Sequence, residues 1–438
     1  MSKIKRLHAK WIIPIEPADV VLERHCLVIE GDRIKDLLPA TEGEKRYPDA
    51  VVSHFPDHVL MPGLINAHTH AAMSLMRGLA DDLPLMTWLN DHIWPAEAAN
   101  LSSAFVRDGT RLAVAEMLRG GITTFADQYF FPEAALEVAI EAGMRIVTGL
   151  AVIDFPTAWA KDPDEALEKG LALHALWHHH PRVHFALAPH APYSVSDAPL
   201  ERIRVLSDQL NIPVHMHIHE TAQEIEQSMA AKGERPMARL KRLGLVNERL
   251  VAVHMTQLID EEIQLLAEVG ASVIHCPESN LKLASGFCPV QKLLDAGIHV
   301  GLGTDGAASN NDLDMFGEMR TAALIAKPVA GSAEAVSGHD ALRMATINGA
   351  RAFGIDSECG SLVIGKQADV IAVDMSQLET RPLFDPISHL VYAASRNQVT
   401  DVWVAGKQLL NNRTLTTIDT DEVLHNADRW QAILRTSA

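Results

Sequence analysis

The stretch Met61-Pro62-Gly63-Leu64-Ile65-Asn66-Ala67-His68-Thr69-His70 combines a turn, a short apolar strand and two histidines separated by one residue. Residues two apart in a strand point to the same side. His68 and His70 can therefore aim at one point just beyond the end of this strand. Two converging imidazoles suit a metal ion, and we expect the chain as far as about Asp305 to bring further groups to that point.

Bulk composition indicates a globular protein. The 438 residues are 47% hydrophobic and 21% charged, which is enough for one large domain and a smaller one. A formal net charge of -18 makes nucleic acid and anionic membrane surfaces poor partners, because like charges repel. No apolar run approaches the ~20 residues of a membrane span. We therefore expect no nucleic-acid partner and no membrane partner.

The cysteines and the first residues indicate the compartment. No pair of cysteines has Cys-x-x-Cys spacing, and no long apolar core of a signal peptide follows Met1 to Arg6. We predict reduced thiols in a cytoplasmic protein. The four scattered cysteines are Cys26, Cys276, Cys288 and Cys359.

The middle of the chain alternates candidate strands with helix-patterned stretches, such as Ser103–Arg119, Pro132–Ala142, Asp197–Leu210, Asp260–Val269 and Val290–Ala296. The number and spacing of the strands match the ~250 residues of an eight-stranded barrel, so we predict an α/β protein with a (β/α)8 TIM-like barrel. A doubly wound open sheet is the alternative, weakened because no Gly-x-Gly-x-x-Gly links a strand to a helix. The eight candidate strands are Leu64–His68, Ile122–Ala126, Arg145–Leu150, Val183–Ala188, Pro213–His217, Leu250–His254, Ala271–His275 and Ile298–Gly303.

Both ends of the chain are rich in short strands. Apolar runs at 11–15 and 26–34 precede the barrel region, and strand patterns at 368–374 and 399–407 follow it. Together they predict one small β-sandwich domain built from both termini, with two unrelated caps as the alternative. We therefore divide the chain into an N-terminal part of the β-sandwich at 1–59, a metal-dependent barrel at 60–362 and a C-terminal part of the β-sandwich at 363–438.

Polar residues follow several of the apolar strands, where a βα barrel carries its chemistry. A lone histidine at such a place is usually structural. The prediction of a functional site therefore depends on polar residues at several strand ends together. In the fifth strand, His217 lies at the C-terminal end, where a metal ligand is expected, and Glu220 follows three residues later, close enough to reach a substrate. His215 is expected one layer deeper, and His219 is expected to support the site from the loop. The other strand ends contribute His190, His254 and Asp305.

These motifs resemble those of the amidohydrolase superfamily. Within it, the chain is similar to the 5'-methylthioadenosine/S-adenosylhomocysteine deaminases, in the group of TRZ/ATZ-type hydrolases that also holds triazine chlorohydrolases. The resemblance covers nearly the whole chain. Beyond the opening stretch it is carried by Arg77-Gly78, Trp88-Leu89, His190-Ala191-Pro192-Tyr193, His217-Ile218-His219-Glu220-Thr221, Ser279-Asn280-Leu281-Lys282-Leu283, Gly303-Thr304-Asp305-Gly306-Ala307-Ala308-Ser309-Asn310-Asn311 and Gly365-Lys366-Gln367-Ala368-Asp369.

The resemblance implies one divalent metal per chain and no bridging carboxylated lysine. The metal is usually Zn²⁺, with Fe²⁺ or Mn²⁺ as alternatives. It also implies substrate contacts from His190 and from Glu97, whose carboxylate would accept two hydrogen bonds from the ribose hydroxyls. The implied metal ligands are His68, His70, His217 and Asp305.

The expected reaction is hydrolytic deamination of an adenine nucleoside to the inosine derivative and ammonia. A zinc ion lowers the pKa of water from ~15.7 toward ~7 and so supplies a nucleophile at neutral pH. Glu220 is expected to protonate ring nitrogen N1. Asp305 is expected to take a proton from the water, and His254 to hold that water in line. Glu220 and Asp305 therefore also count as substrate contacts.

The substituent at the 5' position of the nucleoside is expected to be uncharged. A homocysteine carboxylate would require an arginine at the barrel mouth. Residues 148–155 contain none, and Arg145 lies at the start of its strand. Phe155, Trp159 and Met86 are expected to line an apolar slot for a methylthio group. We therefore favour 5'-methylthioadenosine or adenosine over S-adenosylhomocysteine.

Other functions stay open at this point. A guanine- or cytosine-type deaminase or a triazine chlorohydrolase would use the same metal site. A non-catalytic scaffold on this fold is disfavoured, because such a protein is expected to have lost ligands. The expected partner is a small-molecule nucleoside, and a homo-oligomer is the general expectation for a soluble enzyme.

Overall fold

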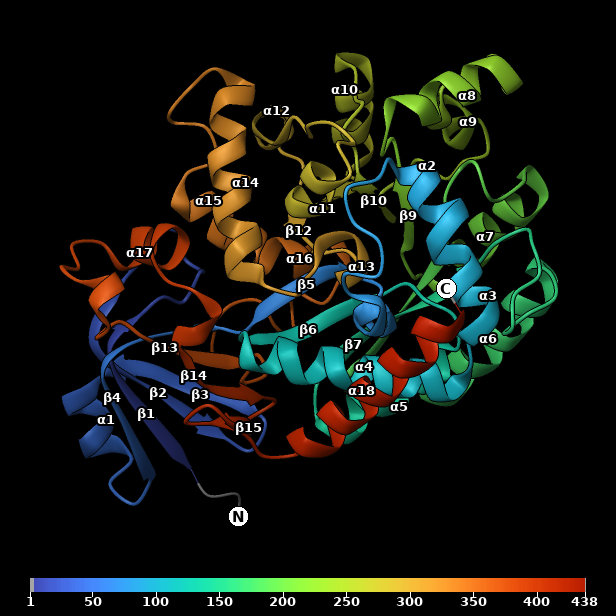
Figure 1. Ribbon diagram of the computed structural model, residues 1–438. Coiled ribbons are helices and arrows are strands. Elements are labelled where there is room, and N and C mark those ends of the chain that lie inside the picture. The colour runs from blue at the N-terminus through green and yellow to red at the C-terminus, as the bar shows by residue number, and fades with distance from the viewer. Residues whose placement is uncertain (1–3, 438) are drawn as a thin grey trace.

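The computed structural model describes residues 4–437 and consists of a βα barrel beside a sheet built from both termini (Figure 1). The barrel strands are parallel and neighbour one another in chain order. The predicted (β/α)8 barrel and its eight strands are thereby confirmed. The strands are β5 (Leu64–Thr69), β6 (Ile122–Asp127), β7 (Arg145–Val152), β8 (Val183–Pro189), β9 (Val214–Ile218), β10 (Leu250–His254), β11 (Ser272–His275) and β12 (Val300–Leu302).

The barrel closes where β12 meets β5. An isolated parallel bridge pairs Thr69 with Asp305, and the Asp305 amide donates to the His68 carbonyl over 3.0 Å. Gly303 permits this approach, because a Cβ at that position would lie 2.7 Å from the His68 nitrogen. The first and last strands of the barrel are therefore joined directly beside the two histidines of the opening stretch.

Helices surround the barrel and bury an apolar stripe against it. In α4, for example, Val106, Ala113 and Met117 are buried at helical spacing. The expected bounds of α4, α5, α7 and α10 are confirmed, and α12 ends one residue early. These helices are α4 (Ser103–Arg119), α5 (Pro132–Ala142), α6 (Pro163–Trp177), α7 (Asp197–Leu210), α8 (Ala222–Lys232), α9 (Pro236–Arg242), α10 (Asp260–Val269), α11 (Pro277–Lys282), α12 (Val290–Asp295), α13 (Ala307–Asn310), α14 (Met315–Ala330), α15 (Gly338–Met344) and α16 (Ile347–Ala352).

The apolar core has two main parts. The larger lies between the strands and the outer helices and includes Phe125, Ile146 and Leu187. A smaller cluster joins Ile65 and Val251, which come from well-separated strands and therefore meet across the barrel interior. None of the helices within residues 4–437 is both long enough and apolar enough to cross a membrane.

A run of short helices follows β5 and leads to the carboxyl ends of the strands. The C-terminal helix α18 (Thr420–Ser437) packs against α3 of this run and against α4, as Figure 1 shows for the red helix. Trp430 in α18 donates from Nε1 to the Asp108 carboxylate over 2.8 Å. The end of the chain thereby supports the run, whose elements are η1 (Ala71–Met76), α2 (Leu85–Trp88), η2 (Leu89–Ile93) and α3 (Trp94–Asn100).

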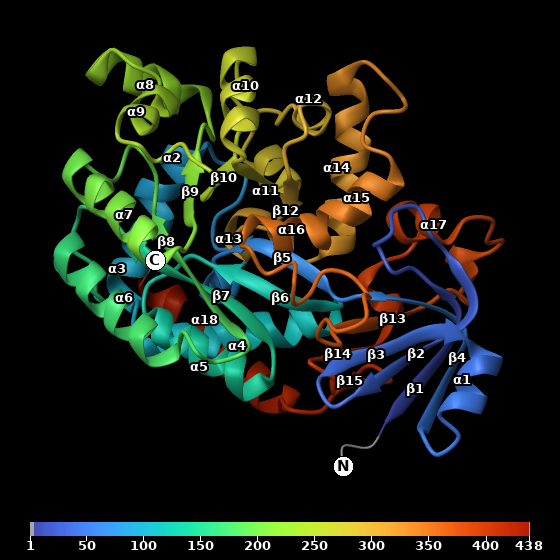
Figure 2. The same cartoon turned by 180° about the vertical axis from the view of Figure 1, so that it is seen from behind.

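The two termini form one continuous sheet, so the prediction of a single β domain from both ends is confirmed (Figure 2). The sheet curls so that Lys5 donates to the Gly406 carbonyl over 2.8 Å and the Phe55 ring packs edge-on against Trp403. An apolar cluster lies between its two halves. In order across the sheet the strands are β16 (Thr414–Leu415), β15 (Lys407–Asn411), β14 (Val399–Val404), β13 (Val370–Asp374), β4 (Val51–Pro62), β1 (Lys5–Ile12), β2 (Leu22–Glu30) and β3 (Arg33–Pro39).

Arg145 joins the barrel to this terminal sheet. It begins β7, is completely buried, and donates to the Asp369 carboxylate over 3.0 Å and to the Pro181 carbonyl over 3.0 Å. It also contacts Glu358 and Gln367. The short helices of the terminal domain are α1 (Ala40–Arg46), η3 (Leu378–Thr380), α17 (Pro386–Tyr392) and η4 (Arg396–Gln398). The division of the chain after residues 59 and 362 stays a prediction.

Candidate active site

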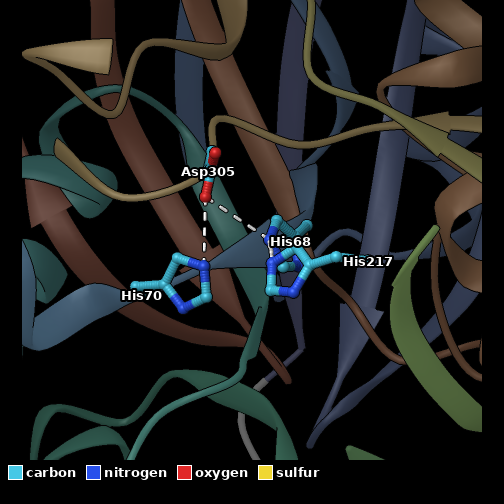
Figure 3. A group of neighbouring side chains, drawn as sticks. All are labelled: His68, His70, His217 and Asp305. Carbon is cyan, nitrogen blue, oxygen red and sulfur yellow. Dashed lines mark hydrogen bonds and ion pairs between the residues drawn. The ribbon is translucent and has the colours of Figure 1, made fainter. Parts of the chain in front are cut away.

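Four side chains from three strand ends meet at the carboxyl end of the barrel (Figure 3). Their nearest nitrogen and oxygen atoms all lie within 4.8 Å of one another. The Nε2 atoms of His68 and His217 are 3.1 Å apart, and His70 Nε2 lies 3.1 Å from an Asp305 oxygen. These are the four residues that the resemblance implies as metal ligands.

Backbone carbonyls fix the direction of two of these rings. His70 Nδ1 donates to the Gln128 carbonyl over 2.6 Å, and His217 Nδ1 donates to the His190 carbonyl over 2.7 Å. Since a carbonyl only accepts, each Nδ1 carries the proton and each Nε2 presents a bare lone pair. Lone pairs that converge on a carboxylate oxygen suit a cation, and three imidazoles with one carboxylate are a donor set for a divalent transition metal. The residues present therefore fit a metal ion.

His215, and not His219, supports this group. His215 Nε2 lies 3.0 Å from His68 Nδ1 in the buried layer beneath. The expected support from His219 is wrong: its Nε2 accepts from the Met237 amide, and its Nδ1 lies 3.5 Å from Glu262. His219 has a positive φ of 55°, which takes it out of the strand's alternation and away from the other histidines.

Two serines orient Asp305. One carboxylate oxygen accepts hydrogen bonds from Ser279 over 2.7 Å and from Ser309 over 3.1 Å. The other oxygen accepts from the Gly306 amide over 2.8 Å and faces the histidines. A role for these serines was not predicted from the sequence, although both lie in the family motifs around residues 279–283 and 303–311. For Ser309, a hydroxyl four residues after a strand-end aspartate was the available signal, whereas Ser279 is 26 residues from Asp305 and had none.

Glu220 and His254 lie next to the four-residue group. Glu220 is only 5% exposed, and burial raises the pKa of its carboxyl group. His254 Nε2 lies 3.9 Å from Glu220, and its Nδ1 is 2.9 Å from the Asn280 side-chain oxygen. The Glu220 amide donates to Glu224 over 2.8 Å. The backbone of the acid predicted from sequence is therefore anchored at the edge of the site.

A cavity of about 400 Å³ opens above these residues, a size within the usual range for small-molecule sites. Glu97 of α3 lines it and accepts a hydrogen bond from the Tyr129 hydroxyl over 2.6 Å. Burial raises the pKa of Glu97 to about 6. His190 also lines the cavity, with its Nδ1 2.8 Å from the Ser194 hydroxyl. Every predicted site residue lines this cavity except His68, which is buried beneath it.

The outer part of the cavity is apolar. The rings of Trp94 and Phe155 meet edge-on there, 5.7 Å between centroids. Phe155 was expected at this place, whereas the expectation for Trp159 and Met86 is wrong, because neither is among the lining residues. Trp94 was missed, although it lies one helical turn before Glu97. Within the described part of the chain the lining contains no lysine and no arginine.

Comparisons with known proteins identify the family. The model of the Amidohydrolase family matches residues 59–409. A curated 5-methylthioadenosine/S-adenosylhomocysteine deaminase from Teredinibacter turnerae is 51% identical over 425 residues, covering 97% of this chain and 96% of the relative. Its counterpart from Saccharophagus degradans is 49% identical over 423 residues, covering 97% and 95%.

Solved structures agree with this relationship. The crystal structure of an adenosine deaminase from Xanthomonas campestris with bound zinc has a TM-score of 0.98 at 53% identity, covering 99% of this chain and 98% of that one. The zinc complex of an atrazine chlorohydrolase from Arthrobacter aurescens has a TM-score of 0.91 at 24% identity, covering 98% and 100%, and shows a shared fold. The chain belongs to the amidohydrolase family, within the group of the 5-methylthioadenosine/S-adenosylhomocysteine deaminases.

Proposed function

We propose that this metal-dependent aminohydrolase deaminates adenine nucleosides, with 5'-methylthioadenosine or adenosine as its substrate and zinc as its metal. The products are the inosine derivative and ammonia. The observation that carries the proposal is one cavity that joins a protonatable buried acid, Glu220, to a four-residue metal-ligand group and to Glu97. The names of the relatives and the zinc in the Xanthomonas structure support the same function.

His68, His70, His217 and Asp305 would hold the metal. When bound, the ion supplies an activated water at neutral pH. The Asp305 oxygen that faces the histidines is placed to accept a proton from the attacking water. Ser279 and Ser309 keep that carboxylate in place through its other oxygen.

Glu220 supplies the proton that ring nitrogen N1 gains as C6 becomes tetrahedral. Its raised pKa keeps more of the carboxyl group protonated near neutral pH, as a general acid requires. His254 faces Glu220 from the next strand, where it holds the attacking water in line. Asp305 then passes its proton to the exocyclic nitrogen, the C6–N bond breaks to release ammonia, and the remaining proton of the water returns to Glu220 as the C6 carbonyl forms, so one water is consumed for each ammonia released.

Glu97 and His190 hold the nucleoside over these groups. An ionised Glu97 accepts hydrogen bonds from the ribose hydroxyls. His190 stays neutral, because burial lowers its pKa to about 3, and it contacts the substrate from the side of β8.

The 5' substituent lies among the apolar residues of the outer cavity. Trp94 is one turn from Glu97 on the same helix, so a ribose on Glu97 directs its 5' carbon toward the Trp94–Phe155 pair. A thioether sulfur makes favourable contacts with aromatic ring edges. A homocysteine carboxylate would find no cationic side chain in this lining, which disfavours S-adenosylhomocysteine.

An ammonia-release screen with zinc-loaded protein tests the function. The screen covers adenosine, 5'-methylthioadenosine, S-adenosylhomocysteine, guanine, cytosine and triazines. Ammonia from the adenine nucleosides with inosine-type products supports the proposal. Turnover of guanine, cytosine or a triazine without turnover of adenine nucleosides would overturn it.

The same assay determines which 5' substituent the enzyme prefers. Comparing kcat/KM for the three adenine nucleosides should place 5'-methylthioadenosine and adenosine above S-adenosylhomocysteine. Phe155→Ala should lower kcat/KM for 5'-methylthioadenosine more than for adenosine, because only the former reaches the ring. A strong preference for S-adenosylhomocysteine would refute the uncharged-tail assignment and leave the deaminase function intact.

A further inference from the structure

Three successive residues at the end of β6, Asp127 to Tyr129, contact both the region of the metal-ligand group and Glu97. The Asp127 carboxylate accepts from the Ala71 amide over 2.7 Å, just beyond His70. The Gln128 carbonyl accepts from His70 Nδ1 over 2.6 Å. Tyr129 then donates its hydroxyl to Glu97 over 2.6 Å. One short segment therefore contacts both a predicted metal ligand and the predicted ribose-binding carboxylate.

This segment is itself fixed in place. The Gln128 side chain donates to the carbonyls of Ala188 and Pro189, 3.3 Å each, at the end of β8. Tyr129 is 5% exposed, and its ring centroid lies 6.4 Å from that of His70. Glu97, in contrast, projects from α3, a helix of seven residues that is not part of the barrel. The phenol hydroxyl connects the Glu97 carboxylate to the end of β6.

We propose that Tyr129 is a positioning residue for Glu97, and that it makes the enzyme selective for nucleosides that carry ribose hydroxyls. The proposal rests on the proposed function. A carboxylate offers about four acceptor sites on its two oxygens. The phenol occupies one site on Oε1, so the Glu97 side chain is held in one orientation, with Oε2 left for the sugar. Without the phenol, the flexible glutamate must be ordered by the substrate itself, at a cost in binding.

The charge state of the pair agrees with this role. Burial and the neighbouring Glu97 carboxylate raise the pKa of Tyr129 well above its usual value, so the phenol stays a donor at all working pH values. The same hydrogen bond favours the ionised form of Glu97. Tyr129 therefore acts on the sugar through Glu97 and has no part in the proton transfers at the base.

The test compares adenosine with 2',3'-dideoxyadenosine in zinc-loaded wild type and Tyr129→Phe. Loss of a hydrogen bond to a charged group predicts a drop in kcat/KM of about 10- to 100-fold for adenosine, mostly through KM. The drop for dideoxyadenosine should stay within about threefold, because that sugar makes no use of Glu97. Zinc content and thermal unfolding are measured in parallel to show that the variant is folded and loaded.

Two further variants separate positioning from general damage. In a Glu97→Gln background, Tyr129→Phe should cost adenosine much less than it does in wild type, because the two residues act as a unit. Tyr193→Phe is the matched control, since Tyr193 lines the same cavity but packs on His190. It should affect both nucleosides equally.

Three results would contradict the role of Tyr129, and one would contradict the proposed function. Equal losses for both nucleosides in Tyr129→Phe, or no loss for adenosine, would overturn the positioning role. Additive losses in the double variant would also overturn it. Wild type without activity on any adenine nucleoside would instead refute the proposed function, and that result is visible before any variant is made.

Discussion

The two ends of the barrel both bury charge, but they do so for different purposes. At the amino end, Arg145 is surrounded by Asp369, Glu358 and carbonyl oxygens that satisfy its guanidinium. At the carboxyl end, Glu220 and Asp305 are equally buried, yet both face a cavity. A closed network serves folding, whereas charged groups that are aimed at an open space are available to a ligand. The same strands therefore connect a stabilising cluster to a reactive one.

The difference predicts opposite results for substitutions at the two ends. Removing a charge at the amino end should cost stability and leave turnover per folded molecule unchanged. Removing one at the carboxyl end should cost turnover and little stability, because buried groups at functional sites are rarely optimal for folding. Four measurements test this contrast, beginning with the largest expected effect.

Glu220→Gln should lower kcat by about 10²- to 10⁴-fold, because the amide keeps the shape of the side chain but has no proton to give. Metal content should equal that of wild type. Glu226→Gln alters an exposed residue on α8, the helix that follows Glu220; it is the control and should retain full activity. Steady-state kinetics with metal analysis checks the prediction, and full activity of Glu220→Gln would exclude its role as the acid.

Arg145→Leu should lower the free energy of unfolding by about 3–5 kcal/mol, because it leaves the Asp369 carboxylate buried without its partner. Urea titration followed by circular dichroism measures this loss. Arg204→Leu removes an exposed pair with Asp208 and should cost less than about 1 kcal/mol. A large loss of kcat/KM per folded molecule in Arg145→Leu, with little change in the free energy of unfolding, would contradict the contrast between the two ends.

His215→Leu should lower metal affinity about 10- to 100-fold, because His215 fixes the ring of His68 from beneath. His219→Leu is the comparison: it alters an equally buried histidine that contacts Met237 instead, and it should leave metal affinity unchanged. Competition with a chelator of known affinity measures both. Equal losses of metal affinity in the two variants would mean that a buried histidine in this region matters more than contact with the metal ligand His68.

Acid should weaken the recognition of ribose. The pKa of Glu97 is raised to about 6, so its ionised form is complete above about pH 7 and is lost as the pH falls through 6. The ratio of kcat/KM for adenosine to that for 2',3'-dideoxyadenosine should therefore fall by up to about tenfold per pH unit below 6. The ratio cancels acid effects on the metal ligands, and a ratio that does not change with pH would argue against Glu97 at the ribose.

Much of this architecture was readable from the sequence. Buried parallel strands are continuous apolar runs, and the polar residues that end them are conspicuous, so β5 to β12 and helices such as α4 and α7 were predicted close to their bounds. The four metal-ligand candidates were named from their positions and from the family resemblance, and the structure brings them together. Their roles stay proposals for the experiments above.

Features that depend on tertiary contacts were not readable. The helices α2, η2 and α3 are short, and their position depends on packing against the barrel and α18 rather than on local propensity. Alternation along β9 could not show that His219 leaves the strand through a left-handed conformation. The contact between Tyr129 and Glu97 joins residues 32 positions apart, with no local pattern to mark it.

The seam between β5 and β12 also gives the site an order of assembly during synthesis. His68 and His70 emerge from the ribosome with the first barrel strand, but Asp305 and the bridge to Thr69 become available only after the last one. A chain that stops before Asp305 offers at most three of the four ligands and lacks the bridge to Thr69 that closes the barrel on the other side of β5 from β6. The full set of four ligands is therefore brought together only when the barrel is complete.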